Sequence, residues 1–165
     1  MIDLDKHKMK AEKQANENKA FLDKLHRKPP KDLDTQTQHL HEEAFERIDC
    51  LQCANCCKSI SPIVIDRDVD RMAKALRMKP SELIDKYLHL DSDGDYVFRQ
   101  TPCPFLMPDN YCQIYEVRPR ACREYPHTDR RRFHQITKLT YKNTFVCPAA
   151  FDVVENLKIA YKGTL

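Results

Sequence analysis

The feature that most constrains this chain is a group of four cysteines within eight consecutive positions. They are Cys50, Cys53, Cys56 and Cys57. The remaining cysteines are Cys103, Cys112, Cys122 and Cys147. A free thiol packs as a small hydrophobic group, but ordinary core packing does not crowd thiols in this way. The N-terminal sequence has no apolar run typical of a signal peptide, so we expect a cytoplasmic protein. In that reducing setting the cysteines favour metal or redox chemistry over disulfides.

The spacing of the cluster narrows the chemistry. Cys-x2-Cys brings two thiolates to one side of a tight turn, and here it occurs twice in succession. Zinc modules often take one such pair from each of two places, whereas bacterial ferredoxins use Cys-x2-Cys-x2-Cys with a further Cys-Pro. Cys147-Pro148 or Cys103-Pro104 could supply that remote member. The spacing therefore favours a 4Fe–4S cluster and leaves zinc as the alternative.

The doublet Cys56-Cys57 indicates more than one metal atom. Neighbouring side chains project in different directions in a helix or strand, so both thiols cannot easily serve one mononuclear site. Eight thiols also divide into two sets of four. Two interpretations stay open: two four-cysteine sites that share the doublet, or one polynuclear centre with spare thiols.

Four segments resemble a known family: "CLQCANCC", "PCPFL", "YCQIYEVRPRACREYP" and the late "CPA". In order and spacing they are similar to the YkgJ-like cysteine-cluster proteins, which are described as zinc- or iron-chelating domains with a Cys-x2-Cys-x2-Cys-Cys signature. The resemblance implies that all eight cysteines are metal ligands. A related cluster in flagellin lysine methylases resembles an iron–sulfur domain, which implies a redox or protein-modification accessory role. No residue is assigned a catalytic role, and the chain has no Gly-rich nucleotide fingerprint.

Arg118 and Arg123 lie within the third of these segments, close in sequence to Cys112 and Cys122. Four thiolates on a divalent metal leave a net negative site, so nearby guanidinium groups can offset that charge or donate hydrogen bonds to sulfur. We therefore predict supporting roles for these two arginines. The alternative is that these arginines form an anion-binding site. We expect the run Arg130 to Arg132 to lie on a solvated surface.

The predicted fold is mainly α with minor β, a small metal-stapled single domain with an N-terminal helical arm. Charged residues make up 32% of the chain and there is no Trp, so the apolar core is thin for its length. We expect a charged helical arm over residues 1–47 and the cysteine-cluster domain over 48–165. Prolines predict helix starts at Pro80 and Pro148. "YVFRQ" predicts a strand, and the alternation in residues 131–146 suggests a hairpin.

The expected partners follow from charge and hydropathy. The net charge is only +3, which disfavours nucleic acid, and no apolar stretch approaches the roughly 18 residues that span a bilayer. We expect an unidentified protein or redox partner and no membrane. The leading function is a metal-binding protein with an iron–sulfur cluster. The alternative is a zinc-stapled structural or interaction module without catalytic activity.

Overall fold

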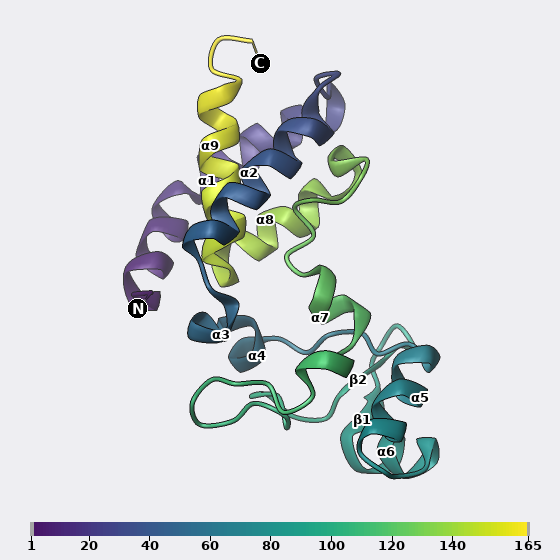
Figure 1. Cartoon of the computed structure of the whole chain (residues 1–165). Coiled ribbons are helices and arrows are strands. Elements are labelled where there is room, and N and C mark those ends of the chain that lie inside the picture. Colours follow the sequence, from purple (N-terminus) through teal and green to yellow (C-terminus); the bar gives the residue numbers. More distant parts are fainter. Residues whose placement is uncertain (1, 165) are drawn as a thin grey trace. The chain divides into compact units, whose positions relative to one another are not determined.

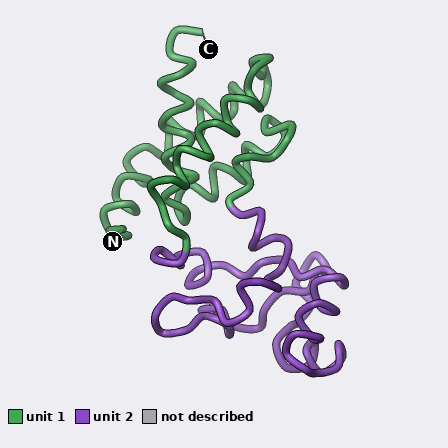
Figure 2. Tube along the Cα trace, viewed as in Figure 1, with its two compact units in different colours: residues 1–50, 126–165 green, residues 51–125 purple. Residues whose placement is uncertain are grey.

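The computed structural model describes residues 2–164 and is mainly helical with one small two-stranded sheet, which confirms the predicted fold class. The chain divides into two compact units (Figure 2). Unit 1 contains Met1–Cys50 and Pro126–Leu165, and unit 2 contains Leu51–Tyr125. Among the described residues, none of the helices combines the length and apolar character needed to cross a membrane.

Unit 1 is a group of packed helices. Its elements are α1 (Leu4–Arg27), α2 (Leu33–Arg47), the 3-10 helix η2 (Phe133–Ile136), α8 (Thr137–Val146) and α9 (Pro148–Ala160), labelled in Figure 1 except η2. The carboxylate of Asp3 accepts the Lys6 N–H at 2.9 Å and caps α1. Pro148 is the first residue of α9, as predicted, because its fixed φ and missing N–H suit that position.

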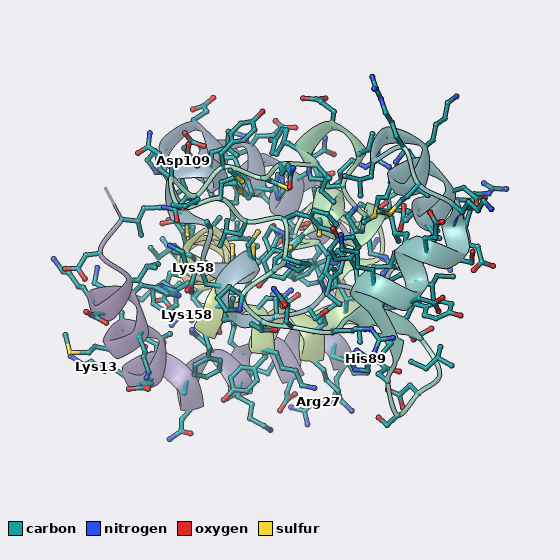
Figure 3. The ribbon with its side chains drawn as sticks, turned by 90° about the horizontal axis from the view of Figure 1, so that it is seen from below. Lys13, Arg27, Lys58, His89, Asp109 and Lys158 are labelled. Carbon is teal, nitrogen blue, oxygen red and sulfur yellow. The ribbon has the colours of Figure 1, made fainter. Side chains whose placement is uncertain are left out.

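Helix α9 packs against α1, α2 and α8 and supplies the apolar centre of unit 1. Its fully buried residues are Ala149, Ala150, Val153, Val154 and Leu157. Residues 1–47, for which we predicted a charged helical arm, contribute α1 and α2 to this unit. Charged side chains of α1 such as Lys13 and Arg27 project outward (Figure 3). The charged composition is therefore compatible with a helix that buries Leu22 and Leu25 on its other face.

The predicted hairpin over residues 131–146 is wrong, because the structure places η2 and α8 there. Threonine and aromatic residues favour strands only where a pleated surface lets them pack. Here Thr137, Thr140 and Thr144 are buried along one helix face at three- and four-residue spacing. The Thr140 hydroxyl donates to the Ile136 carbonyl at 3.1 Å, so a polar side chain is satisfied inside the helical packing. Tertiary packing thus overrides the local strand preference.

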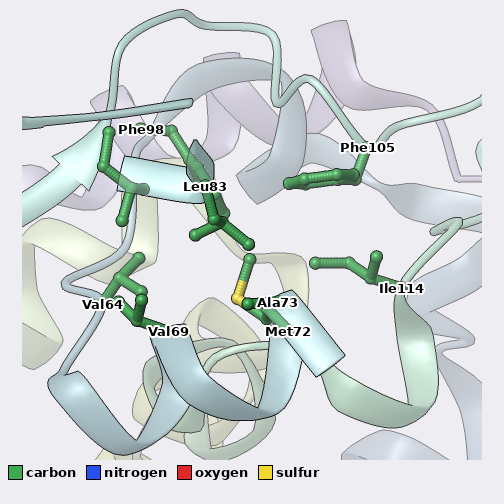
Figure 4. Close-up of a cluster of buried hydrophobic side chains, with 9 residues drawn as sticks. Val64, Val69, Met72, Ala73, Leu83, Phe98, Phe105 and Ile114 are labelled. Atoms are coloured by element: carbon green, nitrogen blue, oxygen red, sulfur yellow. The ribbon is translucent and has the colours of Figure 1, made fainter. Parts of the chain in front are cut away.

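Unit 2 contains α5 (Asp66–Ala75), α6 (Pro80–Tyr87), the antiparallel strands β1 (Leu88–Leu90) and β2 (Tyr96–Phe98), and the short elements α3, α4, η1 and α7 described below. Pro80 begins α6 as predicted, and β2 lies within the predicted strand. Strand β2 also forms an isolated bridge between Val97 and Ile63. These elements surround one apolar cluster (Figure 4), whose buried members are Val64, Val69, Met72, Ala73, Leu83, Leu88, Phe98, Phe105 and Ile114.

We expect unit 1 to lose stability as the pH falls below about 6.5. Burial lowers the pKa of His7 and of His41 below the ordinary value of 6.5. Below 6.5 the unfolded chain therefore binds protons that the folded chain does not, and stability decreases until the folded pKa is passed, by at most about 1.4 kcal/mol per pH unit for each histidine. The loss of stability is measured by denaturant unfolding of the wild type at pH 7.5 and 5.5, with amide exchange in α1 and α9 as the readout for unit 1.

Two variants of α2 test this assignment: His41→Asn, and His39→Asn as its control. His41→Asn can keep the hydrogen bond that the His41 Nδ1 forms with the Thr128 hydroxyl at 2.7 Å, but it removes the titrating ring. It should weaken the pH dependence of unit 1 and leave the part that His7 contributes. His39→Asn changes an exposed ring and should leave that dependence as in the wild type. An equal effect of both variants would contradict the assignment to buried histidines.

Candidate metal centre

The cysteine cluster is carried by two short helices, α3 (Cys50–Cys53) and α4 (Asn55–Ser59). Ala54 separates them in the left-handed conformation, with φ of 48°. A non-glycine residue rarely adopts this conformation, and it interrupts the helix between Cys53 and Cys56. The two Cys-x2-Cys pairs of the sequence therefore differ in backbone: the first pair spans one helical turn, and the second crosses the break.

The doublet brings two sulfurs together and connects the cluster to a distant cysteine. The Cys56 and Cys57 Sγ atoms are 4.0 Å apart. The Cys57 carbonyl accepts the Cys103 N–H at 2.8 Å, so the backbone joins two predicted ligands far apart in the sequence. The hydrogen bond from the Cys56 thiol lowers the pKa of Cys57 to about 7, and the charge of Lys58 contributes in the same direction. Lys58 itself is exposed (Figure 3).

Four thiols of unit 2 interact electrostatically, and we call them the four-thiol group: Cys57, Cys103, Cys112 and Cys122. The pKa of Cys122 is raised to about 12, chiefly by burial and in smaller part by the charges of the other three thiols. Burial also raises the pKa of Cys103 to about 11 and that of Cys112 above its ordinary value. Such mutual effects require the four sulfurs to lie near one another, because Coulomb interactions decay with distance. The structure thus brings together thiols that lie up to 65 positions apart in the sequence, from Cys57 to Cys122.

Local hydrogen bonds hold the last two members of this group. Cys112 forms an isolated bridge with Leu106, and its carbonyl accepts the Tyr115 N–H at 3.1 Å. Cys122 lies in α7 (Arg120–Glu124), where its N–H donates to the Pro119 carbonyl at 3.0 Å. Pro119 is therefore the N-cap residue of the short helix that carries Cys122.

Of the two predicted supporting arginines, Arg118 lies beside the four-thiol group. Its positive charge lowers the pKa of both Cys112 and Cys122, against the larger effect of burial. Its guanidinium stacks on the Tyr115 ring, 3.8 Å from the centroid, and donates to the Tyr115 carbonyl at 2.5 Å. The 3-10 helix η1 (Tyr115–Val117) therefore orients it. Arg123 is exposed, and its role stays a prediction.

The other four predicted ligands are placed as follows. Cys56 is partly buried in α4, Cys53 is buried at the end of α3, and Cys50 is exposed at the start of α3. Cys147 is buried and is the N-cap residue of α9, directly before Pro148. The helix start predicted at Pro148 thus places this thiol at a helix N-terminus, where the positive end of the helix dipole favours a thiolate.

The donor chemistry of the four-thiol group fits a thiophilic metal. Its members are four sulfur donors in a partly buried setting with one guanidinium nearby, and neutral thiols gain little from such crowding. Within residues 2–164, no three or more His, Cys, Asp or Glu side chains are arranged closely enough to hold a metal ion as they stand.

Sequence reasoning missed two residues that hold this region, Asp68 and Arg71. Asp68 is 1% exposed, although aspartate is almost never fully buried unless its carboxylate is paired. It lies on α5 in a stretch of alternating charges, where nothing in the spacing marks it as different from Asp66 or Asp70. Only the tertiary contacts described below distinguish it.

These observations define a mainly helical protein whose second unit gathers cysteines around a site suited to metal. Residues 49–147 match the family model described as "CxxCxxCC: Putative zinc- or iron-chelating domain". The match covers more than half of the chain, so the chain belongs to the CxxCxxCC family, which confirms the predicted resemblance. No curated protein and no solved structure matches the chain.

Proposed function

We propose that this protein binds metal through its cysteine cluster and that the four-thiol group is the principal centre. The observation that carries the proposal is the electrostatic coupling of Cys57, Cys103, Cys112 and Cys122 within one compact unit. Membership in a family described as zinc- or iron-chelating supports it. Binding must displace protons from thiols whose pKa is raised, so metal affinity should increase with pH.

The metal that we favour is iron in a 4Fe–4S cluster, with zinc as the alternative. A 4Fe–4S cluster takes four cysteine thiolates, the number in the four-thiol group. Cys57 of that group directly follows a Cys-x2-Cys-x2-Cys run of the kind found in ferredoxins. Such a cluster would supply electron transfer to a redox step or to modification of another protein. A zinc ion held by four thiolates would supply a structural crosslink for an interaction module. In both cases Arg118 offsets thiolate charge from its place on the Tyr115 ring.

All eight cysteines are ligands if two zinc ions are held, because each ion takes four thiolates. If one 4Fe–4S cluster is held, the four-thiol group supplies its ligands and the other four thiols are spare. The partner is a protein or redox partner of unidentified kind.

The deciding measurement is the content of iron, zinc and acid-labile sulfide per chain, on protein purified without oxygen. About four iron with matching sulfide is expected for the cluster, and about two zinc without sulfide for the alternative. Cys122→Ser should abolish the iron, or reduce two zinc to one. Ser59→Ala, which changes an exposed residue on α4, is the matched control and should leave the content unchanged. A well-folded wild type that contains neither metal would contradict the proposal.

A further inference from the structure

The buried carboxylate of Asp68 accepts hydrogen bonds from three directions. The Arg71 Nη2 donates to Oδ1 at 2.6 Å, and the Ile65 N–H at the start of α5 donates to Oδ2 at 3.3 Å. The Arg120 N–H, 52 positions away, donates to both oxygens at 3.2 Å. A carboxylate this deeply buried is tolerated because these donors compensate for its loss of water.

Arg71 makes a second contact with the same segment. Its Nη2 donates to the Arg118 carbonyl at 2.8 Å while it pairs with Asp68. The pair therefore holds the backbone on both sides of Pro119, through the carbonyl before it and the N–H after it. Pro119 itself is buried and cannot donate a hydrogen bond. The two side chains of α5 thus make the backbone contacts that define where α7 begins.

This backbone segment controls two parts of the four-thiol group. Pro119 is the N-cap residue of α7, and its carbonyl accepts the N–H of Cys122. Arg118 is the residue whose guanidinium lies beside Cys112 and Cys122. α7 has only five residues and cannot hold its own position, because isolated helices that short are unstable. Its orientation has to come from tertiary contacts.

We propose that Asp68 and Arg71 form a clamp on the Arg118–Arg120 backbone that positions Cys122 and the Arg118 guanidinium for metal binding. Both are positioning residues, which act on the centre through the backbone that they hold. The inference rests on the proposed metal-binding function and goes beyond it, since it extends the centre to α5. The clamp connects the thiols with the apolar cluster, because α5 also contributes Val69, Met72 and Ala73 to that cluster.

The test uses Asp68→Asn with Asp70→Asn as its matched control, an exposed aspartate on the same helix. Asparagine retains one acceptor oxygen but places an amide donor against N–H groups. Co²⁺ is the probe, titrated into reduced metal-free protein, because its thiolate complexes absorb in the visible range. We expect Asp68→Asn to bind Co²⁺ about 10-fold more weakly, with shifted visible bands, as for losses of outer-sphere support. Asp70→Asn should match the wild type.

Two further measurements make the result decisive. In the metal-loaded protein, hydrogen exchange at the Arg120 amide should accelerate in Asp68→Asn, because its acceptor is altered, and stay slow in Asp70→Asn. If Asp68→Asn does not fold, Arg71→Lys replaces it, since lysine keeps the charge but lacks the guanidinium whose Nη2 contacts both Asp68 and the Arg118 carbonyl. Unchanged Co²⁺ affinity and bands in both variants, with a wild type that binds, would overturn the clamp alone. A wild type that binds no Co²⁺, zinc or iron would overturn the proposed function, and the role of the clamp with it.

Discussion

Removal of the metal is expected to unfold much of unit 2 while unit 1 keeps its structure. The thiol-bearing segments of unit 2 have little order of their own. α3, α4 and α7 have four or five residues each, below the length at which a helix is stable alone. Between β2 and η1 the chain forms only turns and the bridge between Leu106 and Cys112. Structural zinc contributes on the order of 10 kcal/mol of apparent binding free energy to such small sites.

The measurement is hydrogen exchange by mass spectrometry on loaded protein and on protein made metal-free with a chelator and kept reduced. Protection should be lost chiefly over residues 51–59 and 99–125. The amides of α1 and α9 serve as an internal control, because buried apolar residues such as Leu22, Leu25 and Leu157 stabilise them. Equal loss in both units, or no loss in either, would contradict the view that metal organises unit 2.

The sequence predicted best those features that depend on local chemistry. Pro80 and Pro148 mark helix starts because proline lacks the N–H that the first turn leaves unused. The cysteines were predicted as ligands because their spacing is short and their number high. The family match over residues 49–147 supports metal binding, and the assignment of each cysteine as a ligand stays a prediction.

Features that depend on long-range packing were not predictable from spacing. Nothing in the sequence shows that Cys57 interacts with Cys103, Cys112 and Cys122, because that depends on how distant segments of unit 2 fold together. The helix over residues 137–146 was missed because its buried face is polar, which gives no apolar period to recognise. Asp68 was missed because a buried, paired aspartate has the same sequence appearance as an exposed one.

Phe105→Ala is expected to cost about 3–5 kcal/mol of unfolding free energy, the usual range for removing a buried phenylalanine. Phe105 is 2% exposed and its ring packs on those of Tyr87 and Phe98, with centroid distances of 4.8 and 5.7 Å. Its carbonyl accepts the Gln113 N–H at 2.9 Å. Denaturant unfolding of the loaded protein measures the loss. Phe105→Leu keeps most of the volume and should cost less than about 1.5 kcal/mol.

The same variant tests whether the apolar cluster supports the thiols. Cys103 and Cys112 pack against that cluster on either side of Phe105 in the sequence, so a cavity at Phe105 should let both thiols move. Phe105→Ala should therefore weaken Co²⁺ binding. Phe133→Ala removes an equally buried phenylalanine from unit 1 and should lower stability without changing Co²⁺ affinity. If both variants lower the Co²⁺ affinity equally, general destabilisation explains the effect. If only Phe105→Ala lowers it, the apolar cluster and the thiols form one structure, because the packing of the cluster then holds the ligands in place.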